Sequence, residues 1–260
     1  MHPGAWLVWV ASAALVAVLT TNPFYLIPLV AVCWLVHSAR REPGPQARNF
    51  RVFVLFALFA LFTRTLLVVF SEVTLEAFAS AALEGARLAT LLIVFGTFNS
   101  VSDPFGVLKL SPRRFHEPAL AAALALSIAP RMIDSARRVR EAQRMRGLDT
   151  GRWSSWPALA VPVLENGMEE ALVLAESMDA RGHGRGRRTR YRPQHWSAAA
   201  TFSAVAALAA AVSFLAVAAS DGLSLAVSTY PLSWPSVQLA LVAAVVALAA
   251  PSLIPERTPR

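Results

Sequence analysis

Long apolar runs separated by short polar loops occupy both ends of the chain, and a more polar stretch lies between them. A bilayer core about 30 Å thick needs roughly 20 mostly apolar helical residues to span it. Six runs approach this length: residues 5–20, 23–38, 52–70, 77–99, 196–219 and 236–254. The pattern therefore predicts an all-α membrane protein with about six transmembrane helices.

The arginines predict the orientation of these helices, because positive charges in short loops stay in the cytoplasm. Loop 39–51 holds four arginines, whereas loops 71–76 and 220–235 hold acidic residues and no basic ones. Residues 101–195 hold 16 Lys and Arg against 10 Asp and Glu. Six spans with both termini in the cytoplasm satisfy all of these assignments.

The same pattern predicts three regions along the chain. Residues 1–100 hold the first four spans, residues 101–195 form a cytoplasmic region, and residues 196–260 hold the last two spans and a short cytoplasmic tail. Within the cytoplasmic region two stretches have apolar residues at three- and four-residue spacing, which is typical of amphipathic helices. In residues 118–147 these are Leu120, Leu124, Ile128, Met132, Ala136 and Val139, and in residues 157–182 they are Leu164, Met168, Ala171, Leu172, Ala175 and Met178.

Composition excludes several other classes of protein. The chain is 56% hydrophobic and 15% charged, whereas soluble domains are about 25% charged. Its single cysteine, Cys33, cannot form an intramolecular disulfide or a cysteine-rich metal site, and the five histidines have no metal-ligand spacing. We expect no metal and no cofactor.

The net charge of +8 follows mostly from membrane topology, so we do not expect binding to nucleic acid. A basic run at residues 183–192 stands directly before the fifth span. We expect this run to lie on anionic lipid headgroups of the bilayer, with contact to a protein partner as the alternative.

Three charged residues interrupt the third and fourth spans: Arg64, Glu84 and Arg87. Counting 1.5 Å per residue, Arg64 and Glu84 both lie about 10 Å below the outer ends of their antiparallel spans. An unpaired charge at this depth is costly, so we expect an ion pair, with extension of Arg64 to the outer headgroups as the alternative. Arg87 lies deeper and should face protein or water.

The two amphipathic stretches end alike. One closes with Glu141 and Met145-Arg146-Gly147, and the other closes with Glu176 and Ala180-Arg181-Gly182, 35 residues later. Taken singly, each ending is explained by a helix cap, since glycine caps helix ends and arginine suits the negative end of the helix dipole. Two such tips together indicate a partner-binding role, because an amphipathic helix can lie in a groove of a partner and an arginine can bind a carboxylate there.

With these motifs the chain resembles a known family, the transmembrane T component (EcfT/CbiQ-like) of energy-coupling factor transporters. These transporters import vitamins and metal ions such as cobalt into prokaryotic cells. The most specific likeness is the doubled tip, with Met145 at a position where alanine is commoner in the family. Further likenesses are Glu141-Ala-Gln143-Arg144, Asp103-Pro104, Gly85-Ala-Arg87 and Asn22-Pro23.

The resemblance implies a non-enzymatic subunit in a prokaryotic cell membrane. It would join two ABC-type ATPases to a small substrate-binding membrane subunit. The long amphipathic helices would be coupling helices, and Met145, Arg146, Gly147, Ala180, Arg181 and Gly182 would contact the ATPases. The Ala-rich runs 198–211 and 243–250 would suit contact with the substrate-binding subunit, because small residues let membrane helices approach closely.

Two other functions compete with this interpretation. A conventional ABC transporter permease would also couple to an ATPase, but through a short loop helix. A membrane-embedded enzyme would need titratable or metal-binding groups gathered at one depth. The predicted spans hold a single carboxylate, Glu84, and the sequence has no Gly-rich phosphate-binding loop.

Overall fold

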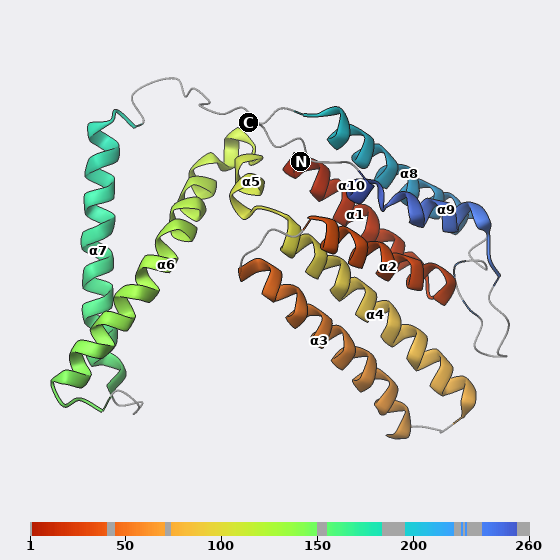
Figure 1. The fold of residues 1–260 in the computed structure, drawn as a ribbon, viewed down its shortest axis with the longest axis horizontal. Coiled ribbons are helices and arrows are strands. Elements are labelled where there is room, and N and C mark those ends of the chain that lie inside the picture. Colours follow the sequence, from red (N-terminus) through yellow and green to blue (C-terminus); the bar gives the residue numbers. More distant parts are fainter. Residues whose placement is uncertain are drawn as a thin grey trace. The chain divides into compact units, whose positions relative to one another are not determined.

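The computed structural model of the chain describes residues 2–40, 45–70, 74–149, 155–183, 196–220, 225, 227 and 236–253. These residues form helices and no strand, which confirms the all-α class. The helices are α1 (Pro3–Leu19), α2 (Pro23–Arg40), α3 (Pro45–Leu66), η1 (Leu67–Phe70), α4 (Leu75–Val101), α5 (Pro104–Lys109), η2 (Arg113–Phe115), α6 (His116–Met145), α7 (Trp156–Ala180), α8 (Ala198–Ser220), α9 (Leu239–Ala247) and α10 (Ala250–Leu253). Figure 1 shows their order.

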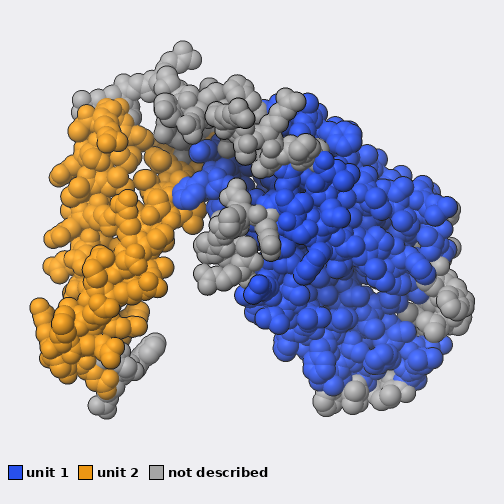
Figure 2. Space-filling model, in the orientation of Figure 1, with its two compact units in different colours: residues 1–110, 194–260 blue, residues 111–193 orange. Residues whose placement is uncertain are grey.

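The chain divides into two compact units, coloured separately in Figure 2. Unit 1 comprises residues 1–110 and 194–260, and unit 2 comprises residues 111–193. The helix α5, which falls in the predicted region 101–195, packs on α1 within unit 1. Whether unit 2 lies in the cytoplasm depends on the position of the membrane and stays a prediction.

Contacts within unit 1 give each helix a direction. The start of α1 meets the start of the segment that leads into α8, where the rings of His2 and Trp196 lie 4.4 Å apart. The start of α2 meets the start of α9, because the Tyr25 hydroxyl accepts a hydrogen bond from the Gln238 amide at 2.9 Å. Helices α3 and α4 are antiparallel, since Gly85 lies against Leu61 and Gly96 against Phe53. The chain therefore crosses unit 1 back and forth.

As a result, several chain segments meet at one end of unit 1. His37, near the end of α2, lies with its Nδ1 atom 2.8 Å from the Ser100 hydroxyl, near the end of α4. The Arg40 Nε atom donates to the Pro251 carbonyl at 2.8 Å. Together with the His2–Trp196 contact, these bonds gather both ends of the described chain, the end of α2 and the end of α4 on one side, as the six-span prediction requires.

Among the described residues, five helices are long and apolar enough to cross a membrane: Pro23–Arg40, Asn49–Leu66, Leu75–Val101, Glu117–Met145 and Ala198–Ser220. Four of them coincide with predicted spans two to five. The remaining one, Glu117–Met145, lies in α6, which the sequence pattern places outside the membrane. The first predicted span corresponds to the shorter apolar helix Pro3–Leu19. The number of spans stays a prediction.

The last predicted span is broken into α9 and α10, a feature that the sequence analysis missed. Pro251 has no amide hydrogen and its ring crowds the carbonyl four residues earlier, which disfavours a regular helix across this point. The break leaves the Leu248 carbonyl without its usual helical partner, and the buried Trp9 indole donates to that carbonyl at 2.9 Å. A side chain on α1 thus satisfies the backbone at the break.

Unit 2 is an antiparallel pair of helices (Figure 1). Arg131 of α6 contacts Glu170 of α7, Ser135 contacts Asn166, and Gln143 contacts the Ala158 carbonyl. Residue numbers rise along α6 while those of their partners fall along α7, so the two helices are antiparallel. The C-terminal end of α6 therefore lies beside the start of α7.

Candidate functional site

The two predicted tips adopt the same backbone structure. Gly147 and Gly182 have φ angles of +81° and +75°, and no other glycine or non-glycine residue described in the structure has a positive φ. An added Cβ atom would meet nothing within 4 Å at either glycine, so the left-handed conformation alone, not crowding, favours glycine at these positions.

The hydrogen bonds at the tips match one to one. After α6, the Gly147 amide donates to the Arg144 carbonyl and the Leu148 amide donates to the Gln143 carbonyl, each at 3.0 Å. After α7, the Gly182 amide donates to the Asp179 carbonyl at 2.8 Å and the His183 amide to the Met178 carbonyl at 3.0 Å. Both sets define a Schellman cap. The cap explanation offered for each tip from sequence is therefore correct for the glycines.

The cap does not use the arginine side chains. Arg146 and Arg181 are exposed, and among the described residues neither guanidinium has a hydrogen bond or an ion pair. Met145, just before Arg146, is 84% exposed, and Ala180 is exposed in the equivalent place. Each tip thus presents an exposed arginine and a small or apolar neighbour on a rigid, capped helix end.

The tips lie at opposite ends of the α6–α7 pair, because each stands at the C-terminus of one of two antiparallel helices. α7 has 25 residues, so its two ends are about 37 Å apart at 1.5 Å per residue. The sequence predicted two similar tips, and the tertiary structure adds that they point in opposite directions along unit 2.

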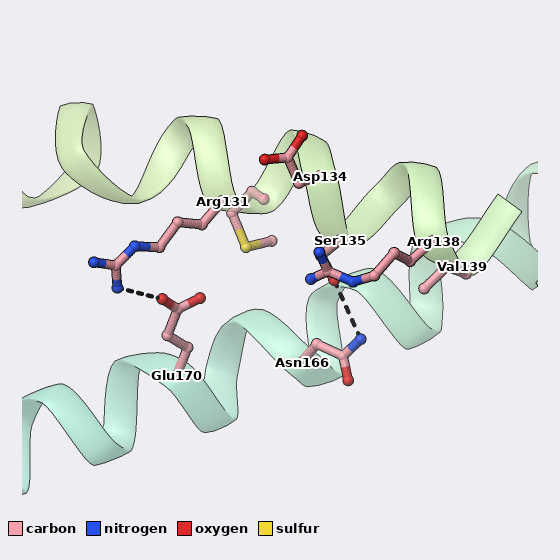
Figure 3. A pocket seen from close by; sticks show the side chains of 8 residues that line it. Arg131, Asp134, Ser135, Arg138, Val139, Asn166 and Glu170 are labelled. Carbon is pink, nitrogen blue, oxygen red and sulfur yellow. Dashed lines mark hydrogen bonds and ion pairs between the residues drawn. The ribbon is translucent and has the colours of Figure 1, made fainter. Parts of the chain in front are cut away.

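Figure 3 shows what joins the two helices. Arg131 Nη1 lies 2.9 Å from Glu170 Oε1, and Asn166 Nδ2 donates to the Ser135 hydroxyl at 3.3 Å. Ser135 is 8% exposed, which makes it a buried polar residue with a partner. Between these contacts, Met132 lies directly on Gly167, where a Cβ atom would come within 2.7 Å of the methionine methyl group.

The predicted apolar stripe of α6 lies partly buried, on the side of α6 that includes Met132. Three members of the predicted stripe of α7 do not pack against α6, since Leu164, Met168 and Leu172 are 63%, 68% and 62% exposed. Met178 of the same stripe is half-buried. Contacts to α6 come from Asn166, Gly167 and Glu170, on another side of the helix. Periodicity identified the apolar face of α7 but could not tell which face meets α6.

The predicted ion pair is present in the structure, since an Arg64 Nη2 atom donates to Glu84. It joins α3 to α4, and its side chains are 43% and 50% exposed at the surface of unit 1. Arg87, one turn further along α4, donates to the Val18 carbonyl near the end of α1. It therefore faces protein, as its depth predicted.

The Ala-rich run of α8 is used within unit 1. Ala200, Ala204, Ala207 and Ala210 are buried and pack with α1 residues such as Ala5 and Ala13. The exposed side of α8 carries larger residues: Phe202, Val205, Leu208, Val212 and Leu215. The expectation that run 198–211 offers a surface of small residues to a partner is therefore wrong for these four alanines, because close packing of α1 and α8 already needs them.

The other motifs that carried the resemblance have local structural roles. Asp103 caps α5, accepting hydrogen bonds from the Phe105 and Gly106 amides at 3.0 Å. Asn22 is fully buried and its side-chain amide donates to the Ser236 carbonyl at 2.8 Å, while the Thr20 hydroxyl donates to the Leu225 carbonyl at 2.8 Å. The turn between α1 and α2 thus binds Leu225 and Ser236, two described residues that precede α9.

In the described part of the chain, His, Cys, Asp and Glu side chains form no group of three that could hold a metal ion. Cys33 is buried in the core of unit 1. The exposed groups described in unit 2 include arginines, carboxylates and apolar side chains. Such groups can bind a protein or a lipid surface.

Comparison with known proteins finds similarity to the family that the sequence motifs resemble. The chain is similar to proteins named energy-coupling factor transporter transmembrane protein EcfT: it is 36% identical to that of Bacillus selenitireducens over 100 residues, which cover 36% of each chain. It is 31% identical to that of Streptococcus thermophilus over 135 residues, 46% of this chain and 50% of the relative. It is 29% identical to that of Listeria innocua over 147 residues, 50% of this chain and 56% of the relative.

The chain thus spans about a third to just over half of the length of the curated relatives that it matches. No protein-family model matches it. Fold and surface define a multi-pass, all-α membrane protein with a capped pair of antiparallel helices. The similarities confirm the resemblance of this protein to the T component of energy-coupling factor transporters.

Proposed function

We propose that this protein is the transmembrane coupling subunit of an energy-coupling factor importer in a prokaryotic cell membrane. The observation that supports this most strongly is the pair of equivalent tips, which present exposed Arg146 and Arg181 from opposite ends of one helix pair. Two equivalent tips suit two equivalent partners, and two ABC-type ATPase subunits meet that requirement. The chain itself would catalyse no reaction.

Each arginine can bind an acidic groove of one ATPase. A guanidinium forms two parallel hydrogen bonds with a carboxylate, which fixes both the distance and the orientation of the partner. Met145 and Ala180 would fill apolar space beside the arginines, and methionine adapts well to an irregular groove. The Schellman caps hold the last helical turns, so a force on a tip is transmitted to the whole helix.

ATP binding would bring the two ATPases together and so move the two tips. Because the tips lie at opposite ends of an antiparallel pair, their movement changes the angle between α6 and α7. The contacts of Arg131 with Glu170 and of Ser135 with Asn166 lie near the middle of α7 and would act as the pivot. The change in angle would move a substrate-binding subunit and release its cargo, a vitamin or a metal ion, into the cell.

The exposed face of α7 supports contact with that small substrate-binding membrane subunit. Val161, Leu164, Met168 and Leu172 form an apolar stripe that is more than 60% exposed at each position. Five acidic residues and no basic one lie within Trp156–Ala180. Cytoplasmic ends of membrane helices are rich in Lys and Arg, so they complement an apolar face flanked by acids.

An affinity pull-down from native membranes tests the ATPase contacts. We compare wild type with Arg146→Glu/Arg181→Glu and with the matched control Lys109→Glu/Arg114→Glu, which makes the same charge change at exposed residues away from the tips. The proposal expects two ATPase chains with wild type and control, and at least tenfold less ATPase with the tip variant. If the tip variant keeps its ATPases, the tips are ordinary helix caps and a conventional ABC permease becomes the better interpretation.

A second variant separates the two partners. Leu164→Ser/Leu172→Ser should keep the ATPases and lose a small membrane protein from the same pull-down. The control Leu208→Ser/Leu215→Ser changes two leucines of the exposed side of α8. Equal recovery of the small protein with both variants contradicts a role for α7 in that contact.

A further inference from the structure

The outer face of α6 carries an ordered stripe that neither the tips nor the α7 contact uses. Its members follow one another at steps of three or four residues, which places them on one side of the helix. They are Ala122, Leu126, Ala129, Ile133, Arg137, Arg140 and Arg144. We call them the α6 outer stripe.

Contacts within unit 2 show that this stripe points away from α7. Arg131 and Ser135 contact α7 through side chains. Ile133 and Arg137 each stand two residues after one of these, which is about 200° around a helix. Ile133 is 55% exposed and the Arg137 side chain is 73% exposed.

The stripe changes character along its length. Its first four members are apolar and cover about 16 Å of helix, and its last three are arginines that cover about 10 Å. The apolar part lies in Glu117–Met145, which is one of the helices that are long and apolar enough to enter a membrane. It is also the part that follows most closely after unit 1 along the chain.

The arginines of the stripe are largely uncompensated. Arg137 lies 3.5 Å from Asp134. Within the described chain, the guanidiniums of Arg140 and Arg144 have no ion pair or hydrogen bond, and Glu141 is the one acidic residue between them. By contrast, the outer face of α7 has acids beside its apolar residues. The two outer faces of the pair thus differ in sign.

We propose that the α6 outer stripe lies on an anionic phospholipid leaflet. Its apolar half would enter the acyl boundary at a shallow angle while Arg137, Arg140 and Arg144 bind lipid phosphates. An interfacial helix of this kind has apolar residues on one part of its surface and basic residues where phosphates lie. An acidic protein surface would satisfy the arginines but would leave Leu126 and Ile133 facing water.

This inference does not depend on the ATPase contacts, because it concerns other residues and another side of the helix. It gives α6 a role as a lever supported by the membrane along one face. It also assigns different surroundings to the two helices of unit 2: α6 would lie on the leaflet, whereas the acids of α7 would be repelled by it.

Lipid titration of the purified full chain, read by native mass spectrometry, tests the proposal. The probes are palmitoyl-oleoyl phosphatidylglycerol, the matching phosphatidylcholine, and inorganic phosphate. The test variant is Arg140→Gln/Arg144→Gln, and the matched control is Arg131→Gln/Arg138→Gln, which removes two charges from the α7 side of the same helix. Circular dichroism checks that both variants keep their helices.

We expect the test variant to bind phosphatidylglycerol about ten- to thirtyfold more weakly than wild type, because each arginine near an anionic surface contributes about 1 kcal/mol. The control should bind within about threefold of wild type. Equal loss in both variants, or equal binding of phosphatidylcholine by wild type, overturns the proposal. Strong binding of inorganic phosphate alone overturns it in favour of a soluble anion.

A spin label tests the apolar half. A nitroxide on Ile133→Cys should be relaxed more by oxygen, which concentrates in the acyl layer, than by a water-soluble nickel chelate. A label on Glu176→Cys, on the acidic side of α7, should behave in the opposite way, and native Cys33 is fully buried. Free access of the nickel chelate to position 133 contradicts insertion.

The pull-down of ATPases gives a further check on the arginines. If Arg140→Gln/Arg144→Gln loses the ATPases but still binds phosphatidylglycerol like wild type, the stripe binds a protein partner and the proposal is overturned.

Discussion

The charged residues in α3 and α4 each have a hydrogen-bonding neighbour within unit 1. Arg64 pairs with Glu84, and Arg87 donates to the Val18 carbonyl. A guanidinium or a carboxylate in an apolar layer is costly, so each must find a partner at its own depth. Matched depth on two antiparallel spans suggested the pair from sequence but left extension of Arg64 to the headgroups open, and the structure shows the pair. The backbone carbonyl on α1 that binds Arg87 could be identified only in the fold.

A double-mutant cycle measures the interaction free energy of the Arg64–Glu84 pair. Arg64→Leu and Glu84→Leu should each lower stability in detergent, and the double variant should lose less than the sum, with an interaction of roughly 1–3 kcal/mol. The matched cycle at Arg131 and Glu170, an exposed pair outside unit 1, should give below about 1 kcal/mol. Additive losses at positions 64 and 84 would show that the pair contributes nothing.

The capping glycines give a second prediction. Gly147→Ala and Gly182→Ala should each destabilise a tip by about 1–2 kcal/mol, because alanine is strained in the left-handed region. Faster hydrogen exchange of the last turn of α6 or α7 would report the loss. Gly167→Ala is the control within unit 2, since its neighbour is the flexible end of Met132. Unchanged exchange at the tips would contradict the assigned cap.

Among the helices, the break between α9 and α10 shows how one element depends on another. Pro251 disfavours a continuous helix, and Trp9 of α1 donates a hydrogen bond to the Leu248 carbonyl at the break. Trp9→Phe should therefore cost about 1–3 kcal/mol, the penalty of leaving a buried carbonyl unsatisfied. Trp6→Phe is the matched control, because Trp6 is 6% exposed and its indole donates to no residue that the structure describes. Thermal unfolding in detergent compares the two, and equal losses would contradict the role of the indole.

The pair α6–α7 shows where helical periodicity stops being informative. Leu164, Met168 and Leu172 form a regular exposed stripe, yet Asn166, Gly167 and Glu170 on another face contact α6. Apolar spacing identifies a face that avoids water. It does not identify the neighbour that covers this face, because that neighbour is far away in the chain.

For the chain as a whole, the packing of unit 1 brings the ends of the described chain to the side where α2 and α4 end. This arrangement makes a prediction about sidedness. With both termini in the cytoplasm, Lys109→Cys should react with an impermeant maleimide only after the cells are permeabilised. Leu75→Cys, at the exposed start of α4, should react in intact cells. The reverse pattern would invert the topology, and buried Cys33 should stay unlabelled in both cases.

The hydrophobic pattern, the arginine distribution and the repeated tips were readable from the chain alone. Each rests on local chemistry: burial of apolar runs in lipid, the cost of moving positive charge across a membrane, and the conformational freedom of glycine. Tertiary structure was needed for the partners of Trp9 and Arg87, the internal use of the α8 alanines, the opposite directions of the two tips and the outward face of α7. These features depend on contacts between residues far apart in the chain, and periodicity carries no information about which neighbour a face will meet.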